Sequence, residues 1–286
     1  MTTTNPLSPV LITGGTGRTG ARITLRLAER SVPFRVGSRR AEIPFDWNDS
    51  STWAGALDGM KAAYLCYSPD LAFPGVPELM SSFTATAADA GVERLVLLSG
   101  RGEDGARAAE DVVRSAGLEW TILRCSWFAQ NFSEHFLLGP VRRGRLMLPA
   151  DPGIPEPFLD LDDLAVVAAD AFTGDDHVGR MLELTGPRLL TLPEVAAELA
   201  AATGRRIEFE QCSPEEFVAD LGNDGVPAED AFPLAELVTE IFDGRNASLT
   251  PDLRAALGRE PTDFRNYAAR SAATGIWDSV VAVGAR

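Results

Sequence analysis

Short apolar runs alternate with longer segments of helical periodicity over the first half of the chain. The apolar runs have the length of buried strands and lie at residues 10–13, 62–66, 95–98 and 120–123, and the second strand is predicted at 34–37. The helical segments between them lie at 19–30, 78–90 and 103–115. Because strand and helix alternate, the pattern predicts right-handed βαβ units. The predicted fold class is α/β, a Rossmann-type doubly wound parallel sheet with helices on both faces.

The pattern changes beyond about residue 149, where residues 149–157 contain four prolines and predict an ordered loop. Further predicted helices and apolar segments alternate at 160–171, 181–184, after Pro193, and at 207–211. We therefore divide the chain into a Rossmann domain over residues 1–150 and a smaller C-terminal α/β lobe over residues 151–286. The two are expected to interleave in sequence.

An amphipathic helix is predicted near the C-terminus from the spacing i, i+3, i+4, i+7 and i+8 of Leu234, Leu237, Val238, Ile241 and Phe242. A polar, glycine-containing loop over residues 222–230 precedes it. Two interpretations are open. The helix either forms a lid over a substrate cleft or packs into the core, which is the commoner role of such a helix.

A glycine-rich turn separates the first predicted strand from the first predicted helix, with the sequence Gly14-Gly15-Thr16-Gly17-Arg18-Thr19-Gly20. Glycine permits a tight turn and lets the backbone approach a pyrophosphate without an intervening Cβ. The unpaired amides at the start of the helix then face the phosphate oxygens. The flanking strand and helix make this a specific pattern, and it predicts a dinucleotide site.

The second predicted strand ends at Ser38-Arg39-Arg40. An acidic residue at this position would bind the ribose 2′-hydroxyl of NAD, whereas arginine accommodates the 2′-phosphate of NADP. A guanidinium also matches phosphate geometry. The alternative is that Arg39 and Arg40 are ordinary solvated charges. The sequence favours NADP(H) as the cofactor.

Charge is distributed unevenly along the chain. Residues 1–40 contain seven arginines and one acid, Glu29, and so sum to +6, whereas the whole chain has a net charge of −15. The remainder therefore carries −21. A small positive region on an acidic protein favours a small polyanion and disfavours nucleic acid or an anionic membrane surface as partner.

Composition places few further constraints. The content of 45% hydrophobic and 23% charged residues is typical of a globular protein, and no apolar stretch has transmembrane length. The first six residues lack the features of a secretory signal. The three cysteines form no CxxC pair, and there are only two histidines. We expect a cytoplasmic protein without a metal.

Several blocks make the chain resemble the NmrA-like family of the atypical short-chain dehydrogenase/reductase superfamily. They are residues 13–20, 45–47, 97–100, 117–124 with Phe128 and Asn131, 158–165, 184–187, 192–194 and 257–264. The resemblance implies NADP(H) binding and a small second lobe that forms the substrate cleft. The family includes reductases of quinones, double bonds and other substrates. It also includes redox sensors that bind the dinucleotide without chemistry.

The turn, the arginines and the resemblance together give a set of expected cofactor contacts. They are Gly14, Thr16, Gly17, Arg18, Thr19, Gly20, Ser38, Arg39, Arg40, Asp46, Trp47, Tyr67 and Ser99.

The Tyr-x-x-x-Lys catalytic pair of the wider superfamily is absent. Lys61 is the only lysine of the chain, and the residue four positions before it is Leu57. Arg101 or Arg107 could contact the ribose, but arginine stays protonated and is a poor general acid. Reduction of a simple carbonyl needs a strong proton donor. Hydride addition to a quinone, an enone or an iminium gives a delocalised anion or a neutral amine, so a conjugated acceptor is favoured.

The candidate catalytic residues are Ser99, Tyr67 and His135. Ser99 either donates a hydrogen bond to a substrate oxygen or caps the following turn. Tyr67 is expected near the nicotinamide, and His135 is a candidate proton donor on a helix that borders the cleft. Trp127 and Phe128 are the candidate substrate contacts, with core packing as the alternative.

The sequence therefore predicts an NADPH-dependent reductase of a quinone-like or conjugated small molecule, plausible as a tailoring enzyme of secondary metabolism. The alternative is a non-catalytic NADP(H)-binding redox sensor or regulator. The expected partner is a small-molecule substrate, with no nucleic acid and no membrane. The sequence gives no oligomeric state.

Overall fold

The computed structural model describes residues 8–68 and 70–278, and these form two compact units. The first unit comprises Met1–Cys125, Leu161–Leu184 and Thr250–Arg259. The second comprises Ser126–Asp160, Thr185–Leu249 and Glu260–Arg286. The chain thus leaves the first unit at Cys125, not at 150, and returns to it twice. Residues 1–7, 69 and 279–286 lie outside the described ranges.

A six-stranded parallel sheet forms the centre of the first unit, with the order β2-β1-β3-β4-β5-β8. The strands are β1 (Val10–Thr13), β2 (Phe34–Gly37), β3 (Ala62–Leu65), β4 (Arg94–Gly100), β5 (Glu119–Cys125) and β8 (Arg180–Leu184). This sheet confirms the predicted α/β fold class. The apolar segment at 181–184, which the sequence assigns to the second lobe, forms the edge strand β8 of this sheet.

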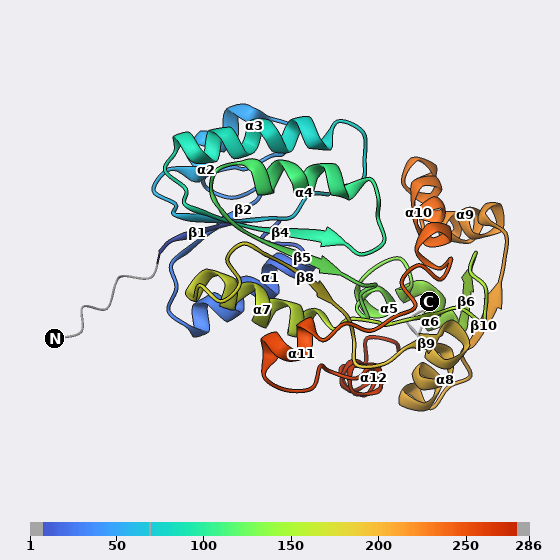
Figure 1. Cartoon of the computed structure of the whole chain (residues 1–286). Coiled ribbons are helices and arrows are strands. Elements are labelled where there is room, and N and C mark those ends of the chain that lie inside the picture. Colours follow the sequence, from blue (N-terminus) through green and yellow to red (C-terminus); the bar gives the residue numbers. More distant parts are fainter. Residues whose placement is uncertain (1–7, 69, 279–286) are drawn as a thin grey trace, which may run out of the picture. The chain divides into compact units, whose positions relative to one another are not determined.

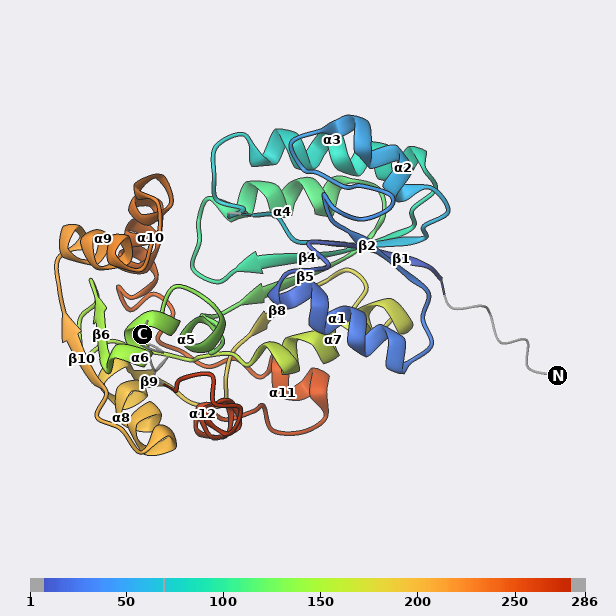
Figure 2. The ribbon, with the colours of Figure 1, turned by 180° about the vertical axis from the view of Figure 1, so that it is seen from behind.

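Helices cover both faces of the sheet (Figures 1 and 2). One face carries α2 (Trp53–Leu57), α3 (Val76–Asp89) and α4 (Ala106–Ser115), and the 3-10 turn η1 (Ser50–Thr52) precedes α2. The other face carries α1 (Arg18–Glu29) and α7 (Leu161–Thr173), with α11 (Asp252–Leu257) packed on α7 and β8. Since both faces are covered, every residue of β1 and β3 is buried.

The register brings the carboxyl ends of the strands together. Val10 of β1 lies opposite Phe34 of β2 on one side and Ala62 of β3 on the other. The loops after β1, β2 and β3 therefore leave the sheet at one edge. In a doubly wound sheet this is the edge at which ligands bind.

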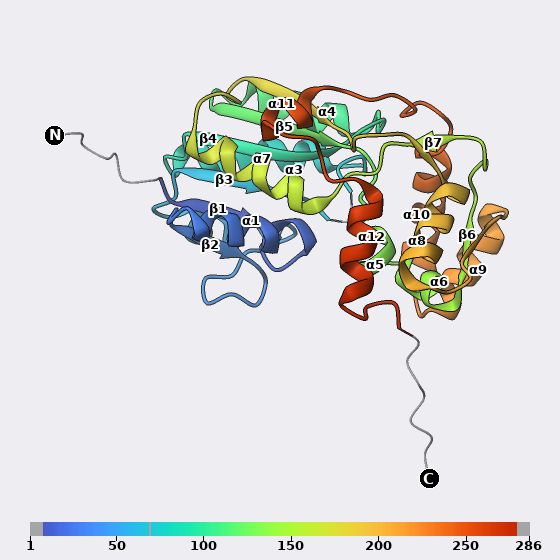
Figure 3. The same ribbon diagram turned by 90° about the horizontal axis from the view of Figure 1, so that it is seen from below.

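The second unit is smaller and contains two short sheets. Its elements are α5 (Asn131–Glu134), α6 (Leu138–Arg143), β6 (Arg145–Leu148), β7 (Pro155–Glu156), β9 (Leu190–Thr191), α8 (Leu192–Thr203), β10 (Glu208–Gln211), α9 (Pro214–Asn223), α10 (Ala228–Ile241) and α12 (Phe264–Ala273). β6 pairs with β10 in parallel, and β7 pairs with β9 antiparallel. Helix α8 packs against α12 and β10 (Figure 3).

The predicted amphipathic helix is present as α10, and its apolar face packs in the second unit. Val238, Ile241 and Phe242 are buried in the core of that unit. Most of the predicted loop 222–230 is helical, since only residues 224–227 separate α9 from α10. This packing favours the core interpretation of the helix over the lid.

Two classes of feature are not found among the described residues. None of their helices combines the length and the apolar character needed to cross a bilayer. No three of their His, Cys, Asp and Glu side chains lie so that they could hold a metal ion.

Candidate functional site

The glycine turn after β1 is closed by its own backbone. Gly14 has a φ of +63°, and its carbonyl oxygen accepts a hydrogen bond of 2.8 Å from the Gly17 amide. A Cβ on Gly20 would lie 2.4 Å from that same oxygen and 2.7 Å from the Gly15 Cα. The first turn of α1 can therefore pack against the turn only because residue 20 has no side chain.

The N-terminus of α1 is left open by this sequence. The capping residue is Gly17, which has no side chain to bond the first amides, and no acidic residue occupies the first turn. The amides of the first turn and the positive end of the helix dipole have the chemistry that suits an anion. Thr16, Arg18 and Thr19, which the sequence selects as cofactor contacts, stand at this helix end.

A set of hydrogen bonds ties the turn to the end of β3. The Thr13 hydroxyl donates to the Tyr64 carbonyl (2.8 Å) and accepts from the Cys66 amide (2.9 Å). The Trp47 indole Nε1 donates to the Cys66 carbonyl oxygen (2.9 Å). The Trp47 ring also lies 5.8 Å from the ring of Tyr67. The structure thus brings Trp47 and Tyr67 together beside the residue that contacts the glycine turn.

Cys66 itself is not a reactive thiol. The Thr19 hydroxyl lies 3.7 Å from its Sγ atom, and burial raises the pKa of the thiol. The thiol form therefore dominates near pH 7, and the side chain acts as packing under the turn.

Asp46 is held in a local turn. Its Oδ1 accepts a hydrogen bond of 3.0 Å from the Asn48 amide, and its carbonyl oxygen accepts one of 2.8 Å from the Trp53 Nε1. These bonds position the following Trp47 at the edge of the sheet.

Arg39 and Arg40, which follow β2, differ from Arg35 within the strand in what their guanidinium groups contact. The Arg35 guanidinium donates to the carbonyl oxygens of Ala56 (2.7 Å) and Asp58 (2.9 Å). Arg39 and Arg40 are exposed, and within ranges 8–68 and 70–278 their guanidinium groups have no hydrogen bond or ion pair.

The backbone before these arginines is anchored. Gly15 donates a hydrogen bond to the Gly37 carbonyl (3.3 Å), and Phe45 donates one to the Ser38 carbonyl (3.0 Å). The segment that carries Arg39 is therefore fixed beside the glycine turn, while its guanidinium stays available for a ligand.

Ser99 lies at the carboxyl end of β4 but its hydroxyl is engaged. It is buried and donates a hydrogen bond of 2.6 Å to Glu110 of α4, which is also buried. The Arg124 guanidinium at the end of β5 donates to both Oε1 and Oε2 of Glu110. Neither interpretation of Ser99 from the sequence included this contact.

The network extends to the edge strand. Arg124 donates to Glu183 of β8 (3.2 Å), and Arg101 donates to the same carboxylate (3.3 Å). Two arginines and two glutamates thus join the ends of β4, β5 and β8. Arg107, in contrast, is exposed and pairs with Asp104 (3.1 Å).

No motif in the sequence marks Glu110 as a site residue, but its position in the apolar stripe of a helix does. Helix α4 buries Ala106, Ala109, Glu110 and Val113, which follow the i, i+3, i+4, i+7 spacing of a core-facing stripe. A glutamate inside such a stripe needs a buried partner.

The remaining candidates lie in the second unit. Trp127 is buried, with its ring 5.3 Å from Phe242 and 6.0 Å from Phe136. Its Nε1 is buried without a hydrogen-bond partner among the described atoms. Phe128 is partly buried and bridges to Leu159.

His135 follows the last residue of α5 and is exposed. Its ring lies edge-on to that of Phe136, at 5.1 Å between the centroids. The sequence expectation placed it on a helix, whereas the structure gives it an extended backbone just after one.

The acidic residues at the start of α7 are ion-pair partners. Asp160 pairs with Arg270 and Asp163 with Arg259, each at 2.6 Å, and both aspartates are buried. Asp162 in the first turn pairs with Arg22 of α1 (2.9 Å). These ion pairs fix helices within each unit.

The parallel sheet and the open glycine turn at the end of β1 define a Rossmann-type dinucleotide-binding protein. No protein-family model matches the sequence. The chain is 33% identical to uncharacterized oxidoreductase YesF of Bacillus subtilis, with 94% of this chain and 98% of that protein covered. It is 32% identical to agroclavine dehydrogenase of Claviceps fusiformis, with 90% and 95% covered.

Solved structures share the fold at lower identity. An NADPH-dependent quinone oxidoreductase of Escherichia coli matches with a TM-score of 0.78 at 21% identity, over 91% of this chain and 99% of that one. An NmrA mutant matches with a TM-score of 0.71 at 17% identity, over 95% and 97%. The chain belongs to the NmrA-like branch of the atypical short-chain dehydrogenase/reductase family and is an NAD(P)H-dependent oxidoreductase.

Proposed function

We propose that the protein is an NADPH-dependent reductase of a quinone-like or otherwise conjugated small molecule. The observation that carries the cofactor choice is the pair Arg39 and Arg40, which are exposed beside the glycine turn and whose guanidinium groups have no partner among the described residues. A 2′-phosphate gives such arginines the bidentate partner that they lack. The amides at the start of α1 suit the pyrophosphate.

The reaction class follows from what the site offers. Bound NADPH supplies a hydride, and the chain has no Tyr-x-x-x-Lys pair to protonate a developing alkoxide. The Ser99 hydroxyl, the candidate donor at this strand end, donates to Glu110 instead. An acceptor that delocalises the incoming charge avoids the need for a strong acid.

The names of relatives agree with such acceptors. One structural neighbour is a quinone oxidoreductase and one relative is agroclavine dehydrogenase, which favours a role in the tailoring of secondary metabolites. In the second unit, the unpartnered indole N–H of Trp127 suits an oxygen or nitrogen atom of an aromatic substrate. Tyr67, Phe128 and His135 remain proposed contacts.

The test of this function is turnover. Purified protein is incubated with NADPH and a panel of quinones, enones and cyclic iminium ions, and the loss of nicotinamide absorbance is followed. We expect saturable oxidation of NADPH with at least one conjugated acceptor and none with simple aliphatic ketones. Equal rates with simple ketones, or no turnover despite tight NADPH binding, would contradict the proposal.

The arginine pair predicts a specific change of cofactor affinity. Arg39→Ala is expected to raise the Kd of NADPH about 10- to 100-fold, since a charge-assisted contact to phosphate is worth about 1.5–3 kcal/mol. The Kd of NADH should change less than threefold. Arg206→Ala is the control, because it removes the same charge from an exposed side chain of the second unit. Titration calorimetry of the wild type and both variants measures the Kd of each cofactor. An equal rise in the Kd of NADH for Arg39→Ala would refute the 2′-phosphate assignment.

Substitutions at two tryptophans distinguish a role in substrate binding from a role in packing. Trp127→Phe removes an unpartnered N–H, so we expect the free energy of unfolding to fall by no more than about 1 kcal/mol and kcat/KM to fall about tenfold. Trp277→Phe removes an indole that donates to the Phe132 carbonyl (2.7 Å), so stability should fall more. Urea unfolding and steady-state kinetics test both. An unchanged kcat/KM in Trp127→Phe would remove Trp127 from the substrate site.

A further inference from the structure

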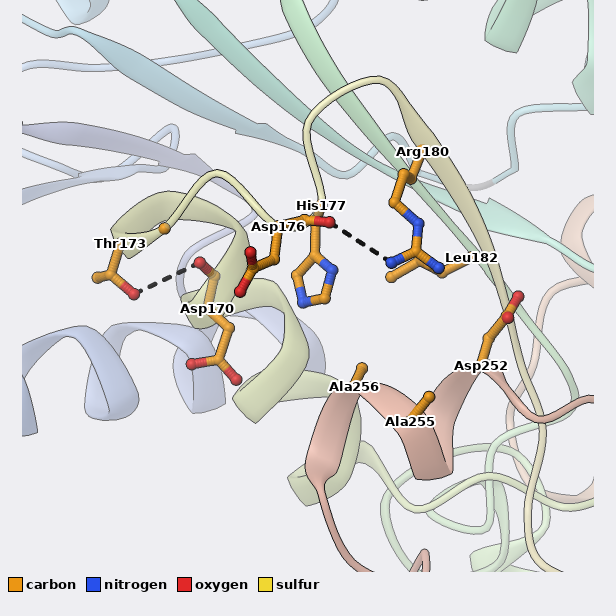
Figure 4. A pocket seen from close by; sticks show the side chains of 10 residues that line it. Asp170, Thr173, Asp176, His177, Arg180, Leu182, Asp252, Ala255 and Ala256 are labelled. Atoms are coloured by element: carbon orange, nitrogen blue, oxygen red, sulfur yellow. Dashed lines mark hydrogen bonds between the residues drawn. The ribbon is translucent and has the colours of Figure 1, made fainter.

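A cavity lies in the first unit, away from the glycine turn. It has a volume of about 310 Å³ and sits at the amino end of β8, whereas the glycine turn sits at the carboxyl edge of the sheet. Its walls come from the end of α7, the loop 174–179, the start of β8 and α11. Figure 4 shows the His177 ring between Asp170 and Asp176 on one side and Arg180 and Leu182 on the other.

His177 is the unusual residue of this cavity. It is 92% buried, with a relative exposure of 8%, yet its Nδ1 is buried without a hydrogen-bond partner among the described atoms. The residue is fixed through its backbone, because its carbonyl oxygen accepts hydrogen bonds from the Thr121 hydroxyl (2.8 Å) and the Arg180 amide (3.2 Å). A buried imidazole that is held in place without a partner is costly unless a ligand or water completes it.

The protonation of His177 decides what it can accept. Burial lowers its pKa, and the positive charge of Arg180 lowers it further, while Asp170 and Asp176 act in the opposite direction. The imidazole is therefore neutral near pH 7 and presents a nitrogen lone pair. A neutral imidazole beside carboxylates calls for a hydrogen-bond donor.

The cavity is acidic overall. Asp170, Asp176 and Asp252 line it against one arginine, Arg180. Asp170 also pairs with Arg30 (2.7 Å), and Asp252 accepts a hydrogen bond from the Glu183 amide (2.9 Å). The Asp176 carboxylate has no ion pair within the described part of the chain. Because its acidic and imidazole groups are not arranged as a metal site, the donor it suits is an organic cation.

We propose that this cavity binds a small organic ammonium ion, such as a primary amine or a diamine. Figure 4 shows Asp176 and Asp252 on opposite sides of the His177 ring, and the two ammonium groups of a short diamine offer N–H donors to their carboxylates. The volume equals that of about ten liquid water molecules, enough for a short aliphatic diamine. The proposal does not depend on the reductase activity.

The two histidines of the chain provide a direct test. His177 lines the cavity, and His135, exposed in the second unit, is the internal reference. We titrate the full-length protein with 1,4-diaminobutane and follow the imidazole resonances by NMR, with sodium chloride at matched ionic strength. Saturable shifts of His177 with an unchanged His135 are expected. Equal shifts of both histidines, the same shifts with sodium chloride, or no shift would overturn the proposal.

Neighbouring aspartates supply a matched pair of variants. Asp176→Asn removes a cavity carboxylate and should raise the Kd of the diamine at least fivefold. Asp175→Asn alters an exposed residue of the same loop that pairs with Arg94 and does not line the cavity, so the Kd should stay within twofold. Both side chains are exposed, which keeps the fold intact. Equal effects of the two substitutions would show that the cation responds only to general surface charge.

Discussion

Glu110→Ala is expected to lower the free energy of unfolding by about 3–5 kcal/mol, the usual cost of removing one partner from a buried ion pair. Glu110 is buried and accepts hydrogen bonds from Ser99 and Arg124, so its loss leaves a buried hydroxyl without its acceptor and a largely buried guanidinium with Glu183 alone. The ends of β4 and β5 should loosen together, since this carboxylate joins them. Urea unfolding followed by tryptophan fluorescence measures the effect.

Glu93→Ala is the matched control for this substitution. Glu93 also pairs with a cation, Lys61 at 2.7 Å, but its side chain is exposed. An exposed pair contributes at most about 1 kcal/mol. Glu110→Gln keeps the shape of the side chain and one acceptor oxygen, so its loss in free energy of unfolding should lie between those of Glu93→Ala and Glu110→Ala. If Glu110→Ala fails to fold, Glu110→Gln should still fold. Equal losses for Glu93→Ala and Glu110→Gln would show that the network is dispensable.

Gly20→Ala is expected to weaken dinucleotide binding about 10- to 100-fold, or 1.4–2.8 kcal/mol. The added Cβ would meet the Gly14 carbonyl oxygen at 2.4 Å, so the turn or the first turn of α1 must shift. Either shift moves the amides away from the phosphate. Overpacking of this kind also lowers stability by about 1–3 kcal/mol. Calorimetric titration with NADPH and urea unfolding give the two quantities.

Gly55→Ala is the control, because Gly55 is also the third residue of a helix, α2. There the added Cβ meets nothing nearer than the Ile43 Cγ2 at 4.0 Å. Replacing glycine by alanine inside a helix stabilises it by up to about 1 kcal/mol, so this variant should bind NADPH normally and unfold no earlier. If both variants bind NADPH equally well, the packing of the turn does not set the affinity.

Local patterns explain why much of the first unit could be predicted. The strands β1 and β2 begin and end at the predicted residues, and for β1 the reason is that a buried strand between helices is a continuous apolar run. The glycine turn could also be located, since each glycine in it answers a local backbone requirement. Whether the Arg39 guanidinium has a partner depends, by contrast, on the residues around it in the folded protein. The sequence therefore left open the alternative that Arg39 is an ordinary surface charge.

Contacts between distant segments account for what the sequence left undetermined. The run at 181–184 suits a buried strand in either unit, and only its pairing with β5 places it in the main sheet. Glu110 of α4 contacts Arg124 of β5, which lies fourteen positions further along the chain. Only the tertiary structure shows that the Trp127 Nε1 and the His177 Nδ1 are buried without a hydrogen-bond partner among the described atoms.

The sequence by itself thus determined the α/β fold, the glycine-rich turn and the absence of the Tyr-x-x-x-Lys pair, because each rests on residue types and short spacings. The tertiary structure alone decided which segments belong to each of the two units, the buried network at Ser99 and the acidic cavity at His177. These arise from side chains that are far apart along the chain, and periodicity carries no information on which distant residues meet.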